Sequence, residues 1–410
     1  MELLAPAGNL EKLQTAVRFG ADAVYCGAGT FSLRSAGSSF TLEELEEGIK
    51  FAHSCNTRVY LAMNLFAFDE DLPEMQAYYD QAIKLGIDAI IVSDPGLVRM
   101  IRKKHDQVHI HLSTQANTTN SESVRFWLEQ GVNRIIMARE VSLKQISIIK
   151  EKIPGAEIEV FVHGAMCIAY SGRCLLSRVF NDRSANRGLC TQPCRWEYQM
   201  REVNRDERMH VTEEAGNTYI LNSRDLCMIE HIPALAAAGV DSLKIEGRMK
   251  TAYYVAAVTR IYRIALDHYR ETGSNYRFDP TWLSELEKVS HRPYTTGFYF
   301  PEKNVEQEYV TDASYIRNYD FVGTIIRAEP ESPELIVEAR NYFAAGDELD
   351  IIEPGSHKII SFKAAEITDL KTGSKLKAAH NSYQVRIRTN YPETLIVKEG
   401  ALLRRKKYDN

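Results

Sequence analysis

Gly86-Ile87-Asp88-Ala89-Ile90-Ile91-Val92 is the stretch that decides the fold. The glycine suits the left-handed residue that ends a helix, and the short apolar run after it predicts a strand buried on both faces. The same turn recurs at Gly131-Val132-Asn133 and Gly239-Val240-Asp241. One helix-to-strand turn used repeatedly indicates a parallel sheet of repeated units, and it favours a closed barrel over an open sheet.

Eight such units follow one another between residues 1 and 270. Short apolar runs alternate there with amphipathic helical stretches, at residues 2–5, 23–26, 58–63, 89–92, 109–113, 134–137, 157–162 and 242–245. Eight strands close a barrel, so we predict an α/β fold of the (β/α)8, TIM-like class. An open, doubly wound sheet is the alternative, but no G-x-G-x-x-G follows the first strand to support a dinucleotide-binding fold.

The connection after the seventh strand is far longer than the few residues usual in such units. We therefore predict a functional insertion over residues 164–228, at the C-terminal end of that strand, within a barrel that spans residues 1–270. A linker and family-specific segment covers residues 271–319. Six short strands with alternating polarity then predict a small all-β barrel over residues 320–410, at 321–326, 335–339, 348–352, 362–367, 383–388 and 401–404.

Composition narrows the class of protein. The formal net charge of −5 argues against a surface that binds nucleic acid or membrane along its whole length, although a local basic patch is compatible with it. The first residues lack the basic and apolar regions of a secretory signal, and no apolar run approaches a membrane span. Seven cysteines in a chain without an export signal indicate thiols or metal ligands in a reducing compartment, so we expect the cytoplasm.

Four of the cysteines lie in the insertion, with the spacing C-x6-C-x15-C-x3-C. They are Cys167, Cys174, Cys190 and Cys194. Four thiolates hold either an iron–sulfur cluster or a structural zinc ion. Zinc sites usually have two knuckles of closely spaced ligands, and only the last two cysteines have that spacing, so the pattern favours iron–sulfur over zinc. Cys26, Cys55 and Cys227 are more typical of structural thiols.

Barrel enzymes place their chemistry at the C-terminal ends of the strands, where this sequence has several polar residues. The candidates for catalysis are Asn64, Asp94, Gln115, His163 and Glu246. His163 and Glu246 flank the insertion, whereas Asp94 precedes a proline and could instead cap a helix. Guanidinium groups bind carboxylates and phosphates, so an anionic small molecule or an RNA backbone is a possible partner. The candidates for substrate binding are Arg34, Arg139, Arg173 and Arg248.

Longer motifs resemble a known family. EVFVHGAMC at residues 159–167 and SGRCLLS at residues 171–177 fit the signature of peptidase family U32. ELLAPAG at 2–8, LNSRDLC at 221–227, LKIEGRMK at 243–250 and HRPYTTGF at 291–298 are similar to the branch of that family that hydroxylates tRNA.

That resemblance implies a 4Fe-4S cluster held by the four insertion cysteines. It also implies oxygen-independent hydroxylation of the wobble uridine in the tRNA anticodon loop to 5-hydroxyuridine, with prephenate, a small dicarboxylate, as co-substrate. Other relatives act on rRNA. A collagenase-like protease is the alternative that the family name suggests, but the sequence contains no H-E-x-x-H and no G-x-S-x-G. A third interpretation is a noncatalytic subunit that carries a cluster or docks RNA.

Overall fold

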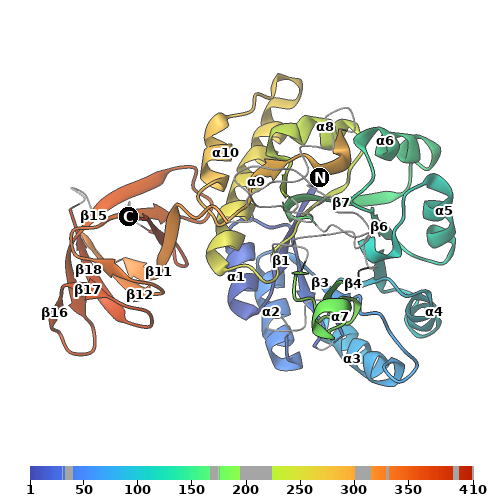
Figure 1. The fold of residues 1–410 in the computed structure, drawn as a ribbon, viewed down its shortest axis with the longest axis horizontal. Coiled ribbons are helices and arrows are strands. Elements are labelled where there is room, and N and C mark those ends of the chain that lie inside the picture. The colour runs from blue at the N-terminus through green and yellow to red at the C-terminus, as the bar shows by residue number, and fades with distance from the viewer. Residues whose placement is uncertain are drawn as a thin grey trace, which may run out of the picture.

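Strand β1 (Glu2–Ala7) pairs in parallel with β2 (Ala23–Gly27) on one side and with β9 (Ser242–Ile245) on the other, which closes the larger of two barrels (Figure 1). This arrangement is seen in a computed structural model, which describes residues 1–29, 31–32, 40–166, 174, 176–193, 224–300, 315–328, 332–390 and 397–408. The candidates Arg34, Cys167, Arg173 and Cys194 lie outside the described residues.

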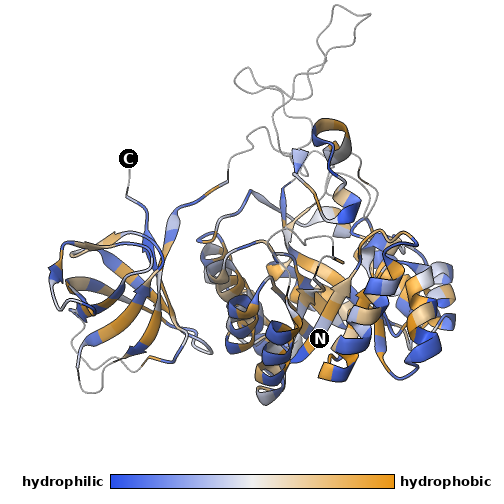
Figure 2. Cartoon of the chain, turned by 90° about the horizontal axis from the view of Figure 1, so that it is seen from below, coloured by the Kyte–Doolittle hydropathy of each residue, from blue (hydrophilic) through white to orange (hydrophobic). Residues whose placement is uncertain are grey.

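The closed sheet confirms the predicted (β/α)8 fold class. Its other strands are β3 (Arg58–Met63), β4 (Ala89–Val92), β5 (His109–Leu112), β6 (Arg134–Ile136) and β7 (Glu157–Ala165). The helices that cover it are α1 (Leu10–Arg18), α2 (Leu42–Ser54), α3 (Leu72–Leu85), α4 (Pro95–Lys104), α5 (Ser121–Glu129), α6 (Leu143–Lys152), α8 (Ile232–Ala237) and α9 (Ala252–Thr272). Apolar residues gather on the strands (Figure 2). Among the described residues, no helix is both long and apolar enough to cross a membrane.

The repeated turn has a structural purpose at the base of the barrel. Its glycines at positions 20, 86, 131 and 239 have φ values of 97°, 95°, 85° and 81°, a conformation that favours glycine. The Asp or Asn two residues later accepts a hydrogen bond from a backbone N–H of the neighbouring strand, and a basic helix side chain holds the same acceptor. The pairs are Asp22 with Leu3 (2.8 Å), Asp88 with Val59 (2.7 Å), Asn133 with Ile110 (2.9 Å) and Asp241 with Ile158 (2.8 Å).

The insertion begins where β7 ends. Its described part holds α7 (Leu176–Asn181) and the 3-10 turn η2 (Ala185–Arg187). After it, β8 (Asp225–Cys227) runs antiparallel to the end of β7 and parallel to β10 (Tyr294–Thr295). A buried ion pair, Arg292 Nη2 to Asp225 Oδ1 at 2.8 Å, joins the two short strands. The chain therefore leaves the insertion at a fixed point beside the barrel mouth.

The C-terminal residues form the second barrel. Strands β14 (Glu348–Ile352), β19 (Leu402–Lys406), β11 (Tyr319–Ala328), β12 (Glu334–Ala339), β18 (Gln384–Thr389) and β15 (Ile359–Asp369) pair in this order, and β15 returns to β14. These strands correspond to the six predicted ones. Short pairs at β13 (Phe343–Ala344), β16 (Lys375–Leu376) and β17 (Ala378–Ala379) complete the domain.

Specific contacts hold the two barrels together. Helix α10 (Pro280–Leu286) lies in the segment predicted as a linker, and its Glu285 accepts hydrogen bonds from both terminal nitrogens of Arg404 at 2.8 and 3.0 Å. Tyr253 of α9 stacks on Phe321 of β11, with ring centroids 5.8 Å apart. The boundaries at residues 270 and 320 remain predictions, but these contacts fix one domain against the other.

Candidate functional site at the mouth of the larger barrel

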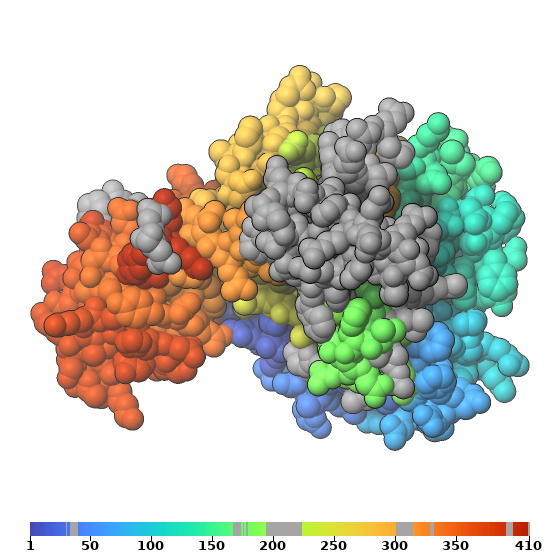
Figure 3. All heavy atoms as spheres, in the orientation of Figure 1, coloured from blue at the N-terminus to red at the C-terminus, as the bar shows by residue number. Residues whose placement is uncertain are grey.

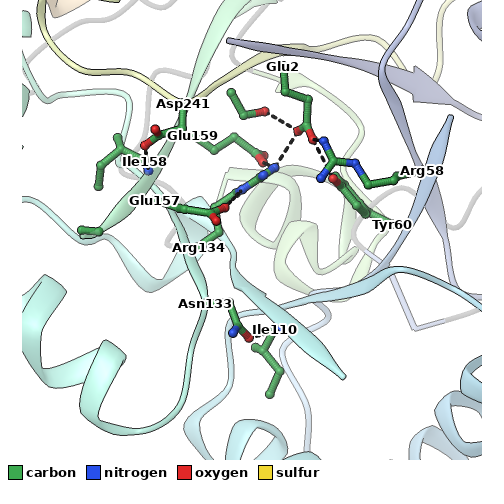
Figure 4. Close-up of polar contacts among 12 residues, drawn as sticks. Glu2, Arg58, Tyr60, Ile110, Asn133, Arg134, Glu157, Ile158, Glu159 and Asp241 are labelled. Carbon is green, nitrogen blue, oxygen red and sulfur yellow. Dashed lines mark hydrogen bonds and ion pairs between the residues drawn. The ribbon is translucent and has the colours of Figure 1, made fainter. Parts of the chain in front are cut away.

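Charged side chains from β1, β6, β7 and β9 form a network in the interior of the larger barrel, and Figure 4 shows the part of it formed by Glu2, Arg134 and Glu159. Glu2 accepts a hydrogen bond from Arg134 at 2.6 Å, and Arg134 also lies 3.3 Å from Glu159. Lys244 Nζ donates to the other oxygen of Glu159 at 2.8 Å. All four side chains are buried, and such charges persist inside a protein because each has an opposite partner.

Lys244 is the residue that β9 contributes to this network. Burial lowers the pKa of its ammonium group, while the carboxylate of Glu159 opposes that effect. The ammonium nitrogen lies 4.3 Å from the centroid of the Tyr25 ring and 5.6 Å from that of Phe161. The floor of the barrel mouth is thus cationic and lined by aromatic rings.

Above the Phe161 ring lies a salt bridge at the ends of two strands. Arg139 Nη2 is 3.1 Å from Glu246 Oε2, and its guanidinium carbon lies 4.2 Å from the Phe161 centroid. Both side chains are mostly buried, with 12% and 20% exposed. The structure therefore brings together two of the predicted candidates, one for substrate binding and one for proton transfer.

Arg248 lies at the same end of the barrel. Its Nη1 donates to Ser32 Oγ at 3.2 Å, its guanidinium carbon lies 6.0 Å from the Tyr25 centroid, and the residue is 4% exposed. The hydroxyl of Tyr25 donates to the carbonyl oxygen of Ile245. This end of the barrel therefore has three positive groups, Arg248, Arg139 and Lys244, and two carboxylates, Glu246 and Glu159.

Polar amides line another part of the rim. Asn64 Nδ2 donates to Ser113 Oγ at 3.4 Å, and that hydroxyl donates to Gln115 Oε1 at 2.9 Å. The structure thus connects Asn64 with Gln115 through one serine. Asp94 has a different position, since its carboxylate accepts the Leu97 N–H at 2.9 Å and caps helix α4. Helix capping is the role that the following proline suggested.

His163 does not face the mouth. The pairing of β7 with β9 shifts register between Phe161 and His163, so the histidine lies on the helix side of the strand. Its ring is packed among Tyr254 and Tyr262 of α9 and Tyr294 of β10, with centroids 5.4–6.0 Å away. Burial lowers its pKa to about 3. The expectation that His163 moves a proton at the mouth does not fit this position, and Glu246 is the member of the pair that does.

The described cysteines differ in how far they are exposed to solvent. Cys26 and Cys227 are buried, and burial raises the pKa of each to about 12, so neither readily forms a thiolate. Cys174 and Cys190 are partly exposed and lie in the insertion above the mouth. The backbone N–H of Cys174 donates to Asn186 Oδ1, which ties its segment to the turn η2. Cys55 is also exposed, but it follows helix α2 and lies outside the insertion.

Two family models match nearly the whole chain between them. The model of Peptidase family U32 covers residues 8–309, and that of Peptidase family U32 C-terminal domain covers residues 317–404. The chain belongs to peptidase family U32.

Relatives of this U32 chain are named for different activities. The tRNA hydroxylation protein P1 of Bacillus subtilis (strain 168) is 38% identical over 94% of this chain and 90% of its own length. A collagenase of Porphyromonas gingivalis (strain ATCC BAA-308 / W83) is 33% identical, over 91% of this chain and 92% of its own. The 23S rRNA 5-hydroxycytidine C2501 synthase of Escherichia coli (strain K12) is 31% identical, over 94% of this chain and 56% of its own.

Sequence reasoning missed part of the U32 site. Glu2, Arg134, Glu159 and Lys244 lie within strands that were interpreted as apolar, and none was a candidate. Their signal was present, because Ser242, Lys244 and Glu246 alternate along β9 and its C-terminal end and share one face of it. A charged residue inside a short buried strand marks the lumen of the barrel.

Proposed function

We propose that this chain is an RNA-modifying enzyme that hydroxylates the wobble uridine of tRNA at carbon 5, giving 5-hydroxyuridine. We further propose that the reaction is independent of molecular oxygen and requires prephenate. The likeness to tRNA hydroxylation protein P1 along nearly the whole chain carries the proposal. A wobble base is unpaired in the anticodon loop, so turning it into a barrel mouth costs little stacking energy.

The charges at the mouth support a dicarboxylate co-substrate. A dianion needs convergent cations, and Arg139 and Arg248 lie at the same end of the barrel. The guanidinium of Arg139 already donates a hydrogen bond to one carboxylate, that of Glu246. We propose that these two arginines, with Arg34 and Arg173, bind the carboxylates of prephenate.

The polar groups at the mouth suit proton transfer and orientation. Glu246 is held by Arg139, so its carboxylate is fixed where it can accept or return a proton. The amides of Asn64 and Gln115 are the kind of groups that recognise the edge of a uracil ring. We assign binding of the base to these amides and proton transfer to Glu246.

The insertion fits a metal centre by its donor set. Cys174 and Cys190 are partly exposed cysteines of the insertion, and we propose that they bind a 4Fe-4S cluster together with Cys167 and Cys194. Such a cluster supplies electron transfer. A structural zinc ion is the alternative for the same four thiolates.

The proposal is tested by mass spectrometry of tRNA nucleosides from cells that lack the protein, with and without the intact gene. We expect 5-hydroxyuridine to disappear and to return on complementation. A change in rRNA nucleosides alone would assign the enzyme to rRNA. Unchanged nucleosides together with gelatin cleavage by the purified protein would support the protease, although the buried, high-pKa thiols of Cys26 and Cys227 disfavour a cysteine nucleophile.

A further inference from the structure

A cavity of about 550 Å³ lies where three parts of the molecule meet. Glu246 contributes from the barrel mouth, Gln192 from the insertion, two residues after Cys190, and Arg317 and Phe321 from the start of the C-terminal barrel. Its size is within the range of ligand-binding pockets. In Figure 3 the C-terminal domain, coloured orange to red, lies directly against the larger barrel. The cavity therefore shares Glu246 with the candidate active site.

The lining of this cavity holds three basic side chains, Lys250, Arg317 and Arg340, and two acidic ones, Glu246 and Asp320. Arg317 is exposed and donates from Nε to Ser290 Oγ at 3.1 Å, and the structure's described part gives it no carboxylate partner. Lys250 Nζ donates to the carbonyl oxygen of Ser290 at 3.3 Å. The acidic lining residues are engaged elsewhere, since Glu246 pairs with Arg139 and Asp320 pairs with Arg405.

Aromatic rings accompany these cations. Lys250 Nζ lies 5.1 Å from the Tyr254 centroid and 4.7 Å from the Tyr315 centroid. Tyr253 and Phe321 form a nearly parallel stack in the same wall, with an interplanar angle of 4°. Cations that follow a phosphate backbone, interleaved with aromatic rings, are the chemistry by which proteins hold single-stranded nucleic acid.

We propose that this cavity binds the single-stranded RNA that flanks the modified nucleotide, with Arg317 and Lys250 contacting phosphates. The proposal rests on the proposed function for the identity of the substrate. A nucleotide turned into the mouth beside Glu246 leaves its neighbours on the chain within reach of this cavity. The C-terminal barrel then supplies one wall of the RNA site.

The wall is held rigidly enough for this role. The ion pair between Glu285 and Arg404 and the hydrogen bond from Arg260 Nε to the Ser356 carbonyl at 2.8 Å cross between the two barrels. Arg340 also pairs with Glu11 of α1 from the C-terminal side of the cavity. These contacts keep Arg317 at a constant position relative to Glu246.

The test uses the full-length protein, purified without air, and a fluorescein-labelled anticodon stem–loop RNA with uridine at the wobble position. Fluorescence anisotropy at several salt concentrations gives Kd and its salt dependence for wild type, Arg317→Ala and Arg317→Lys. Arg386→Ala is the matched control, because Arg386 is an exposed arginine of the C-terminal barrel that does not line the cavity. Nucleoside analysis of the same RNA after reaction measures hydroxylation separately.

We expect Arg317→Ala to weaken binding by about 3- to 10-fold. The slope of log K against log salt should fall by about 0.7, the value for one phosphate contact of a single strand. Arg317→Lys should keep that slope, and Arg386→Ala should match wild type. Equal Kd and slope for wild type and Arg317→Ala, or wild type that binds no RNA, would overturn the RNA site.

Hydroxylation separates the two proposals. RNA binding that depends on Arg317, without any hydroxylated nucleoside, would uphold the cavity and remove the proposed function. If hydroxylation persists and RNA binding does not depend on Arg317, the proposed function would be upheld and the RNA site in the cavity would be wrong. If Arg317→Ala lost affinity for gelatin but not for RNA, the cavity would belong to a protein partner and the RNA site would be wrong.

Discussion

Arg139 and Glu246 face each other at 3.1 Å across the mouth of the barrel, the arginine after β6 and the glutamate after β9. Their chain separation is 107 residues, so the closed barrel is what brings them together. Each side chain fixes the other above the Phe161 ring. A carboxylate held in this way has one orientation when substrate arrives, which is the arrangement that proton transfer requires.

Glu246→Gln keeps the shape and hydrogen bonds of this side chain but removes its ability to accept a proton. We expect kcat for hydroxylation to fall by about 10²- to 10⁴-fold, the usual contribution of a general acid or base, with a smaller change in KM. Steady-state kinetics on the stem–loop RNA measures both. Asp94→Asn is the control, because Asn caps helices as well as Asp does. A Glu246→Gln enzyme with wild-type kcat would remove Glu246 from the chemistry.

Arg248→Ala should weaken binding of prephenate without changing the iron content. Loss of one charge-assisted contact costs about 1.5–3 kcal/mol of binding free energy. Calorimetric titration of the cluster-loaded protein gives this value directly. Ser32→Ala serves as the control, because it removes a hydroxyl that accepts a hydrogen bond from Arg248 but keeps the guanidinium. Equal affinity of wild type and Arg248→Ala would place the dicarboxylate elsewhere.

Cys174→Ala and Cys190→Ala should each lower the iron and sulfide content and abolish hydroxylation. Cys174 and Cys190 lie outside the buried core cluster, so thermal unfolding of the barrel should change little. Cys55→Ala is the matched control, since Cys55 is an exposed free thiol that follows helix α2. Stoichiometric zinc in protein made with adequate iron would favour the structural-zinc interpretation, and full activity of both variants would exclude the cluster from the reaction.

The barrel strands could be predicted because each is a short apolar run bounded by a turn with its own chemistry. Strand β8 was not predicted, because its three residues form a strand only through pairing with β7 and β10. The side of β7 on which the His163 ring lies could not be predicted from the sequence either. Regular alternation from Glu159 and Phe161 would place its ring in the lumen, and the register shift that reverses it depends on pairing with β9.

In the candidate site, too, some residues could be predicted from the sequence and others could not. Four residues could be predicted to lie at the barrel mouth because they follow the C-terminal ends of strands: Glu246, Arg139, Asn64 and Gln115. Position along a strand determines which end of the barrel a residue occupies. Lys244 and Glu159 were missed because hydrophobicity patterns assign charged residues to the surface. Their burial depends on partners from strands distant in the sequence, which no local pattern contains.

His163 makes the stability of the protein depend on pH. Its pKa in the folded state, about 3, is below the usual value near 6.5 because the buried ring stays neutral. As pH falls from 6.5 toward 3, the unfolded chain binds a proton that the folded chain does not, so stability decreases by about 1.4 kcal/mol per pH unit from this group. Urea unfolding of His163→Phe should lack this component. Parallel pH curves for the two proteins would contradict the assignment.

The repeated turn predicts a stability effect that depends on the acceptor atom rather than on the charge. Asn133 Oδ1 accepts the N–H of Ile110 and also contacts Arg102 Nη2 at 2.6 Å. Asn133→Ala removes the acceptor of the Ile110 N–H and one of the two acceptors of Arg102 Nη2, and it should lower the free energy of unfolding by about 1–3 kcal/mol. Asn133→Asp keeps the acceptor, as Asp88 and Asp241 do at the equivalent turns, and should be nearly neutral. Urea titration measures the difference, and equal losses in the two variants would show that the side-chain acceptor does not stabilise the base of the barrel.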